Sequence, residues 1–251
     1  IKYPKFFKNI IFKEIKNYDL IVTDYEPITA WSAKYYGKKI IGIGNQYAFR
    51  DKSLPRPKKK SRLGEFFLRW FAPVNKYIAI GYESTGDNSV QPIINKVPTN
   101  SVNKDFCLVY LPSFRLTEIQ DKLMNINKTF KVYSPSIRQK HVINNIHFNP
   151  VNKEEFAASF RYCDSIICAA GFQTTAEALI FNKKMYVIPM KNQYEQMCNV
   201  ESLEKIGVYC NPFFRKYLVI DWLNMESNVD YKWTDPTDDV VNKIISYSEN
   251  H

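Results

Sequence analysis

Short apolar runs alternate with stretches of helical periodicity along most of the chain. Leu20–Val22 and Ile40–Ile43 are continuous apolar runs of the kind that form strands buried on both faces. Between them, residues 28–36 show helical spacing and end before Gly37, a residue type that commonly terminates helices. This order predicts a β-α-β unit, whose crossover connection requires the two strands to be parallel.

The alternation continues almost to the end of the chain. Residues 83–104 interrupt it, because they contain Gly, Pro, Asn and Ser with little periodicity. We therefore expect an α/β protein with two Rossmann-like, doubly wound parallel-sheet domains. The predicted domains are residues 1–97 and 98–235, followed by a C-terminal helix at 236–251 that packs back toward the interdomain cleft. The other predicted strands are 77–80, 107–111, 130–133, 146–148, 165–168 and 185–188, and the other predicted helices are 5–17, 63–71, 116–124, 153–161, 174–181 and 195–206.

Composition places the chain among ordinary globular proteins. Of its 251 residues, 45% are hydrophobic and 24% are charged, which excludes a collagen-like or wholly disordered chain. Lys and Arg number 35 against 25 Asp and Glu, so an anionic partner is favoured, such as a nucleotide, a nucleic acid or an acidic membrane face. No apolar run approaches the ~18 residues of a membrane span, and no signal peptide is evident. The five cysteines form no C-x-x-C pair, and we expect reduced thiols in a cytoplasmic protein.

A strand followed directly by small residues and a helix is the most informative local pattern. Residues 165–168 predict a buried strand, Ala169–Gly171 follow it, and a helix begins near Thr174. Parallel sheets bind ligands beyond the carboxyl ends of their strands, where a helix N-terminus offers amide groups and a positive dipole end to a phosphate. Thr174 and Thr175 would add hydroxyl donors, and Glu177 would accept hydrogen bonds from a ribose. From the pattern alone, an ordinary tight turn with threonine caps is an equal alternative.

The segment GFQTTAEAL, from Gly171 to Leu179, resembles the donor-binding signature of nucleotide-sugar glycosyltransferases with two Rossmann-like domains, the GT-B fold. A strand ending at Pro189 and the segment EQMCN, from Glu195 to Asn199, resemble the next element of that signature. The resemblance is nearest to the MJ1255-like branch, beside the UDP-glucuronosyltransferase and bacterial lipid-intermediate N-acetylglucosaminyltransferase groups. It implies that Gly171, Phe172, Gln173, Thr174 and Thr175 hold the donor diphosphate, that Glu177 holds the ribose, and that Glu195, Gln196 and Asn199 hold the donor sugar.

The first half carries a less specific form of the same resemblance. DLIVTDYEP, from Asp19 to Pro27, resembles the acceptor-domain strand whose terminal aspartate orients a catalytic histidine in some relatives, and Asp24 is the matching catalytic position. That histidine lies upstream in relatives, whereas His141, His147 and His251 all lie in the second half of this sequence. We therefore expect the acceptor domain to be incomplete, with a front portion outside this chain or supplied by another chain. The alternative for Asp24 is a capping role at the helix that follows.

A basic, proline-containing loop precedes an aromatic helix. Cationic charge beside an aromatic amphipathic helix suits contact with an anionic membrane surface. The alternative is a solvated loop and a helix whose aromatic side chains fill the core. Nucleic-acid binding is not expected, because the basic run is short and no recognised motif accompanies it. The basic residues are Arg56, Lys58, Lys59, Lys60 and Arg62, and the apolar residues of the helix are Phe66, Phe67, Leu68, Trp70 and Phe71.

The sequence contains no pattern typical of a metal site. His141 and His147 have no cysteine or carboxylate cluster at ligand spacing, and there is no Asp-x-Asp, so we expect neither a metal nor another cofactor. The resemblance implies an inverting glycosyltransferase that uses a nucleotide-diphosphate sugar, a UDP-sugar in particular. Its acceptor would be a small molecule, a glycan or a lipid, and its location the cytoplasm or the inner membrane face. The alternatives are a UDP-N-acetylglucosamine 2-epimerase-like isomerase and a non-catalytic or split-subunit nucleotide-sugar binding protein.

Overall fold

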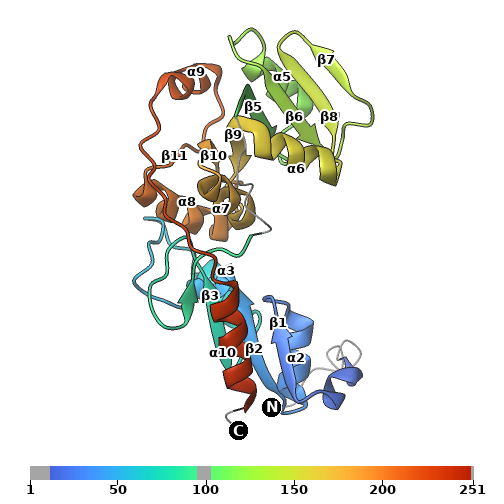
Figure 1. The fold of residues 1–251 in the computed structure, drawn as a ribbon, viewed down its shortest axis with the longest axis vertical. Helices are drawn as coiled ribbons and strands as arrows, with labels where there is room; N and C mark the ends of the chain where they lie inside the picture. The colour runs from blue at the N-terminus through green and yellow to red at the C-terminus, as the bar shows by residue number, and fades with distance from the viewer. Residues whose placement is uncertain (1–11, 95–102, 250–251) are drawn as a thin grey trace. The chain divides into compact units, whose positions relative to one another are not determined.

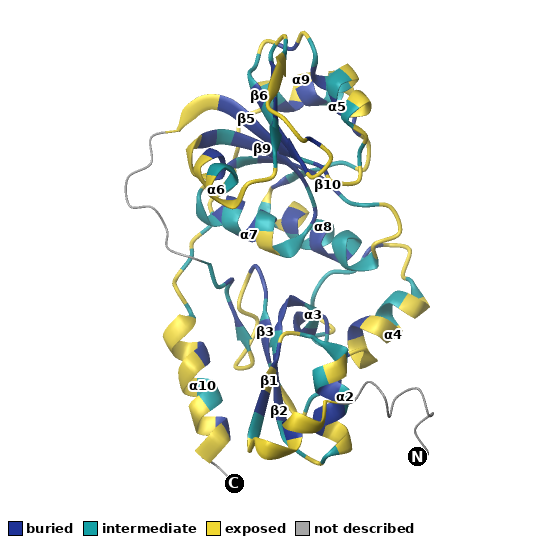
Figure 2. Cartoon of the chain, turned by 90° about the vertical axis from the view of Figure 1, so that its right-hand side faces the viewer, coloured by how far each residue is buried: buried dark blue, intermediate teal, exposed yellow. Residues whose placement is uncertain are grey.

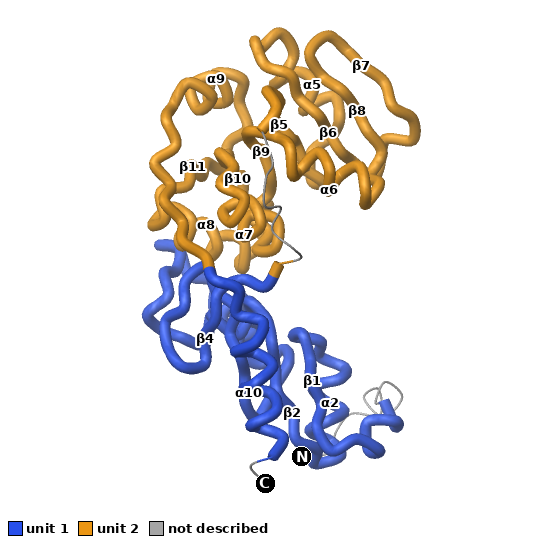
Figure 3. The backbone as a smooth tube through the Cα atoms, in the orientation of Figure 1, with its two compact units in different colours: residues 1–93, 234–251 blue, residues 94–233 orange. Residues whose placement is uncertain are grey.

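The computed structural model describes residues 12–94 and 103–249. The chain divides into two compact units, the first comprising residues 1–93 and 234–251 and the second residues 94–233 (Figure 3). Each unit has its own sheet and its own buried core. The predicted helix at 5–17 lies partly outside the described residues, and its described part is a 3-10 helix, η1 (Lys13–Asn17), rather than an α-helix.

Unit 1 is built on a four-stranded parallel sheet with the strand order β1-β2-β3-β4. β1 (Leu20–Thr23) and β2 (Lys39–Gly44) are joined by α2 (Pro27–Tyr35), which confirms the predicted β-α-β unit. Gly37 follows α2 with a φ of +64°, in the left-handed region that glycine adopts without strain. The other elements of the unit are α3 (Asn45–Ala48), α4 (Arg62–Trp70), β3 (Lys76–Ile80), β4 (Ser89–Val90) and α10 (Thr237–Glu249).

Helices cover both faces of this sheet. Successive side chains of a strand point to opposite faces, so Ile40 and Ile41 of β2 enter different apolar clusters. Ile40 packs with Ala33 of α2, whereas Ile41 packs with Val240 and Tyr247 of α10. The C-terminal helix therefore belongs to unit 1 and lies along its sheet (Figure 1).

Unit 2 contains a seven-stranded sheet with the order β11-β10-β9-β5-β6-β8-β7. Every neighbouring pair is parallel except β7 and β8, which are antiparallel. The parallel sheet of unit 1 and the mainly parallel sheet of unit 2 confirm the predicted class, α/β with two Rossmann-like units. The strands are β5 (Lys104–Tyr110), β6 (Phe130–Ser134), β7 (His141–Ile143), β8 (Ile146–Pro150), β9 (Cys163–Ala169), β10 (Lys184–Ile188) and β11 (Tyr209–Cys210), and the helices are α5 (Leu116–Leu123), α6 (Lys153–Tyr162), α7 (Phe172–Ile180), α8 (Tyr194–Ile206) and α9 (Lys216–Asn224).

The helices of unit 2 divide between the two faces of the sheet (Figure 2). The connections from β8 to β9, β9 to β10 and β10 to β11 run in one direction across the sheet, so right-handed crossovers place α6, α7 and α8 on the same face. The connection from β5 to β6 runs the other way and places α5 on the opposite face, where α9 packs against it. The core on that face includes Leu123 of α5 and Trp222 of α9, which are 0% and 1% exposed.

Most residues of helix α4 are exposed or partly exposed (Figure 2). Phe66 is 58% exposed and Trp70 is 51% exposed, and Leu68 is the buried residue of the helix. The alternative in which these aromatic residues fill the core is therefore wrong. Across residues 12–94 and 103–249, no helix combines the length and the apolar character needed to cross a membrane.

Candidate functional site

The junction between β9 and α7 lies near the centre of the unit 2 sheet. β9 is flanked by β5 and β10, and its last residue, Ala169, pairs with Ile188 at the end of β10. Gly171 follows with a φ of −70°, an angle that any residue can adopt, and a Cβ atom added to it would meet no atom within 4 Å. Neither backbone strain nor packing among the described residues requires glycine here. The space beside this backbone is therefore open to a ligand.

Helix α7 begins without a side-chain cap. Its N-cap residue, Gly171, has no side chain that could accept hydrogen bonds from the first turn. Thr175 is fully buried, and its hydroxyl lies 2.9 Å from the carbonyl oxygen of Gly171 and 3.0 Å from that of Phe172. The Thr175 hydroxyl has one proton to donate, and its contact with these backbone carbonyls stabilises the first turn of the helix. The neighbouring residue, Thr174, is partly exposed. The positive end of the helix dipole lies beside the open space at Gly171.

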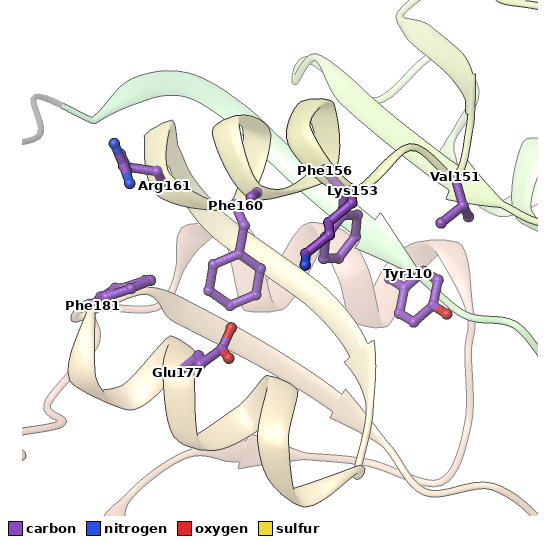
Figure 4. A pocket seen from close by; sticks show the side chains of 9 residues that line it. Tyr110, Val151, Lys153, Phe156, Phe160, Arg161, Glu177 and Phe181 are labelled. Carbon is purple, nitrogen blue, oxygen red and sulfur yellow. The ribbon is translucent and has the colours of Figure 1, made fainter. Parts of the chain in front are cut away.

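Glu177 lines a cavity between α6 and α7 (Figure 4). The cavity has a volume of about 860 Å³. The carboxylate of Glu177 points into it toward the ring of Phe160, and its Oε1 accepts a hydrogen bond of 2.7 Å from Nε2 of Gln173, one turn earlier on α7. The cavity thus combines a carboxylate with aromatic walls. Its other lining residues are Tyr110, Val151, Lys153, Phe156, Ala157, Arg161 and Phe181.

A buried amide connects α8 to the β9–α7 junction. Asn199 is 1% exposed, and its Nδ2 donates a hydrogen bond of 3.0 Å to the carbonyl oxygen of Ala170, the residue before Gly171. The two sequence elements that predict donor binding are therefore joined directly in the structure. The contact places Asn199 behind the Gly171 turn rather than on its surface.

Gln196 stabilises the loop between β10 and α8. Its Oε1 accepts a hydrogen bond of 2.9 Å from the backbone N–H of Met190, and its Nε2 donates one of 2.7 Å to Oε1 of Gln193. Glu195, one residue earlier, is partly exposed in the first turn of α8, where the helix dipole favours an acidic side chain. Of the three residues predicted to hold a donor sugar, Glu195 is partly exposed, and the amide groups of Gln196 and Asn199 form hydrogen bonds within the protein.

Asp24 lies directly after β1 in unit 1, and it does not cap α2. The cap is Glu26, whose carboxylate accepts hydrogen bonds from the backbone N–H groups of Ile28 (2.8 Å) and Thr29 (2.6 Å), so the capping alternative for Asp24 is wrong. The Asp24 carboxylate lies close to β2. A Cβ atom added to Gly44, the last residue of β2, would be 2.8 Å from Oδ1 of Asp24. Partial burial of the carboxyl group raises the pKa of Asp24.

The cysteines are free, and those in the unit 2 sheet are poor nucleophiles. Cys168 is fully buried in β9, and burial raises its pKa to about 12, so the thiol is protonated at neutral pH. Within the described ranges, no group of three or more His, Cys, Asp or Glu side chains gathers as potential metal ligands.

Solved structures with the same fold are glycosyltransferases of the GT-B class. VinC in complex with dTDP has a TM-score of 0.58 at 11% identity, with 98% of this chain and 76% of VinC covered. Arabidopsis thaliana UGT89C1 complexed with UDP has a TM-score of 0.59 at 11% identity, with coverage of 90% and 72%. Acinetobacter baumannii MurG has a TM-score of 0.58 at 13% identity, with coverage of 92% and 74%. At these identities the comparison establishes the fold.

A match to a sequence-family model identifies the chain more specifically than the likeness in fold does. The model of glycosyl transferase family 1 matches residues 2–213, and the chain belongs to this family. It is a glycosyltransferase, and the predicted resemblance to the GT-B glycosyltransferases is confirmed. No curated protein has a significant sequence match to it.

Sequence reasoning missed the cavity beside Glu177. Its aromatic residues come from three segments: the end of β5, α6 and the residue that follows α7. The sequence contains part of the pattern that forms this cavity: Phe156 and Phe160 are four residues apart and share one face of the predicted helix at 153–161. That spacing predicts a buried face, but it does not distinguish a filled core from a cavity.

Proposed function

We propose that the chain transfers a sugar from a UDP-sugar to an acceptor hydroxyl, without a metal and with inversion at the anomeric carbon. The observation that carries this proposal is the uncapped N-terminus of α7 beside the open space at Gly171, on the same helix as Glu177. A helix N-terminus suits an anion, and a concave site with aromatic walls suits a nucleoside. The complexes of VinC with dTDP and of UGT89C1 with UDP, two proteins of the same fold, support a nucleoside diphosphate as the ligand.

In this proposal the diphosphate binds at the first turn of α7. Gly171 lets the phosphate approach the backbone, and Phe172, Gln173 and Thr174 form the turn whose amides have no acceptor earlier in the helix. The Thr174 hydroxyl adds a donor. The buried hydroxyl of Thr175 contributes indirectly, by stabilising the turn.

The nucleoside extends from this turn toward the cavity. Glu177 accepts hydrogen bonds from the ribose hydroxyls, in place of its present donor, Nε2 of Gln173. The base lies against the aromatic walls of the cavity, where stacking on rings such as Phe156 offsets the loss of hydration.

The donor sugar lies near the β10–α8 loop. Glu195 binds the sugar hydroxyls through its carboxylate, and Gln196 holds the loop that presents it. We assign Asn199 a positioning role, because its amide is buried against Ala170 and supports the Gly171 turn.

The reaction is a direct displacement. The acceptor oxygen forms a bond to the anomeric carbon while the bond from that carbon to the diphosphate oxygen breaks, and the hydroxyl proton passes to a general base. The helix dipole and the first-turn amides stabilise the charge that develops on the leaving diphosphate, as preorganised donors do. Asp24 would orient the residue that accepts the proton and stabilise its cationic form, the role that the family resemblance implies.

A panel of nucleotides tests the proposal. The melting temperature is measured with UDP, GDP, CMP and ADP, and a ligand present at a hundred times its dissociation constant should add ~2.7 kcal/mol of stability. We expect selective stabilisation by UDP. No stabilisation by any of the four, in a chain that melts cooperatively, would contradict the donor site and favour a non-catalytic role. A UDP-sugar converted to a different UDP-sugar without an acceptor would show an epimerase instead.

A further inference from the structure

A second cavity, in unit 1, is lined mainly by cationic side chains. It has a volume of about 350 Å³ and lies between the segment after α3 and one face of α4. Among the described residues that line it, Glu65 is the one with a carboxylate. The cationic residues are Arg50, Lys52, Arg56, Arg62 and Arg69, and Phe49 and Phe66 complete the lining.

Arg56 is the structural member of this group. Its Nε lies 2.9 Å from Oε1 of Glu65, and a terminal nitrogen donates a hydrogen bond of 2.6 Å to the carbonyl oxygen of Phe49. Its side chain is 10% exposed. Arg56 therefore neutralises the one carboxylate of the cavity and fixes the wall between α3 and α4.

The other four cations have no ion-pair partner among the residues that the structure describes. The guanidinium of Arg50 lies 5.0 Å from the ring centroids of both Tyr47 and Tyr77, and its Nε is buried without a hydrogen-bond partner among the described residues. These cation–π contacts hold the guanidinium in place without an ion pair. Arg62 and Arg69 lie seven residues apart, on one face of α4, and both are exposed.

Acidic groups also lie on the other side of Arg50, but among the described residues none of them forms an ion pair with Arg50 or Lys52. Arg50 and Lys52 also line an adjoining cavity of about 480 Å³, which contains Asp51 and Asp87. The Asp51 carboxylate is occupied by the backbone N–H of Ser53 (2.8 Å) and the hydroxyl of Thr85 (3.0 Å). Like charges gathered around one small cavity repel one another, and an anion bound among them would remove that repulsion.

We propose that the cavity of Arg50, Lys52, Arg62 and Arg69 binds a phosphate group. The planar fork of a guanidinium matches two phosphate oxygens, and four cations without an ion-pair partner among the described residues suit a phosphate monoester or a diphosphate better than a single carboxylate. All of these residues belong to unit 1. The proposal therefore does not rest on the donor site in unit 2.

Two kinds of molecule, which we call carriers, present a phosphate group of this kind: a membrane lipid and a soluble phosphorylated acceptor. The neighbouring face of α4 exposes apolar side chains: Leu63 is 66% exposed, Phe67 47% and Trp70 51%. A lipid headgroup would place its phosphate in the cavity while these side chains enter the membrane interface. A soluble phosphorylated acceptor would use the cavity alone.

Titration with pyrophosphate tests the cavity. The intact chain is titrated in a calorimeter with UDP present in excess, so that the donor site is not counted. Arg62→Gln/Arg69→Gln should weaken pyrophosphate binding by about tenfold or more, since each removed arginine takes away charge-assisted hydrogen bonds. The matched control is Lys58→Gln/Lys59→Gln, which removes the same charge from exposed positions of the adjacent loop outside the cavity. Equal weakening in both variants, or no saturable binding by the wild-type chain, would overturn the proposal.

Cosedimentation with vesicles identifies the carrier. Phosphatidylcholine vesicles with and without phosphatidic acid are compared, and melting curves check that each variant is folded. Binding to phosphatidate vesicles that is lost in Arg62→Gln/Arg69→Gln and weakened by Trp70→Ser supports the cavity with a lipid carrier. Saturable pyrophosphate binding without vesicle binding supports it with a soluble carrier. Vesicle binding that falls equally in both charge variants would contradict phosphate binding in the cavity.

If no nucleotide of the panel stabilises the chain, only the proposed donor site is contradicted, because the charge variants report on unit 1.

Discussion

Replacing Glu177 with alanine is expected to weaken UDP binding by about 10- to 100-fold, the loss that follows when hydrogen bonds to a charged group are removed. The carboxylate lines the cavity between α6 and α7, and its other interaction is with an exposed glutamine on its own helix. The folded structure should therefore tolerate the change. Calorimetric titration with UDP measures the effect, and Glu177→Gln, which keeps one acceptor oxygen, should lose less.

Glu154→Ala provides the matched control for Glu177. Glu154 is exposed in the first turn of α6 and does not line the cavity. Its removal should leave UDP affinity within about twofold, since exposed charges have small effects. If Glu177→Ala and Glu154→Ala bind UDP equally well, the ribose role of Glu177 is wrong.

Replacing Asn199 with alanine is expected to lower the free energy of unfolding by about 1–3 kcal/mol and to weaken UDP binding as well. The stability loss follows because the carbonyl of Ala170 loses its donor in a buried environment. The affinity loss follows because that carbonyl immediately precedes Gly171. Urea denaturation and calorimetry on the same variant separate the two effects.

Asn224→Ala serves as the control for Asn199. Asn224 is exposed at the end of α9, and its replacement should change stability by no more than about 0.5 kcal/mol. A loss of stability in Asn199→Ala with full UDP affinity would show that Asn199 supports the fold without positioning the Gly171 turn.

The strands and helices that carry a clear apolar run or helical spacing could be predicted from the sequence, and several short elements without such a pattern could not. The buried strands and the amphipathic helices of both units were predicted because each repeats its pattern over several residues. α3, β4, β7 and β11 have four residues or fewer and lack a continuous apolar run such as Leu20–Val22 of β1, which has four residues too. α9 is different: Leu218, Val219, Trp222 and Leu223 recur at helical spacing, and this signal was missed.

The candidate site could be located from the sequence, but the burial of its members could not. A strand, small residues and a helix in succession define the β9–α7 junction without tertiary information. Whether a hydroxyl or an amide faces a ligand or the protein depends on contacts from distant segments. Thr174 and Thr175 are adjacent, yet one is partly exposed and the other donates inward. Asn199 meets Ala170, 29 positions earlier, and no local pattern reports this contact.

Hydrogen exchange with and without UDP tests the central claim most directly. The backbone amides of Gln173 and Thr174 lie in the first turn of α7, where no earlier carbonyl of the helix can accept from them. A diphosphate bound there should slow their exchange. The account predicts that UDP protects the peptide covering residues 169–177 more strongly than any other segment of unit 2. UDP binding that leaves this peptide unprotected, with protection elsewhere, would contradict it.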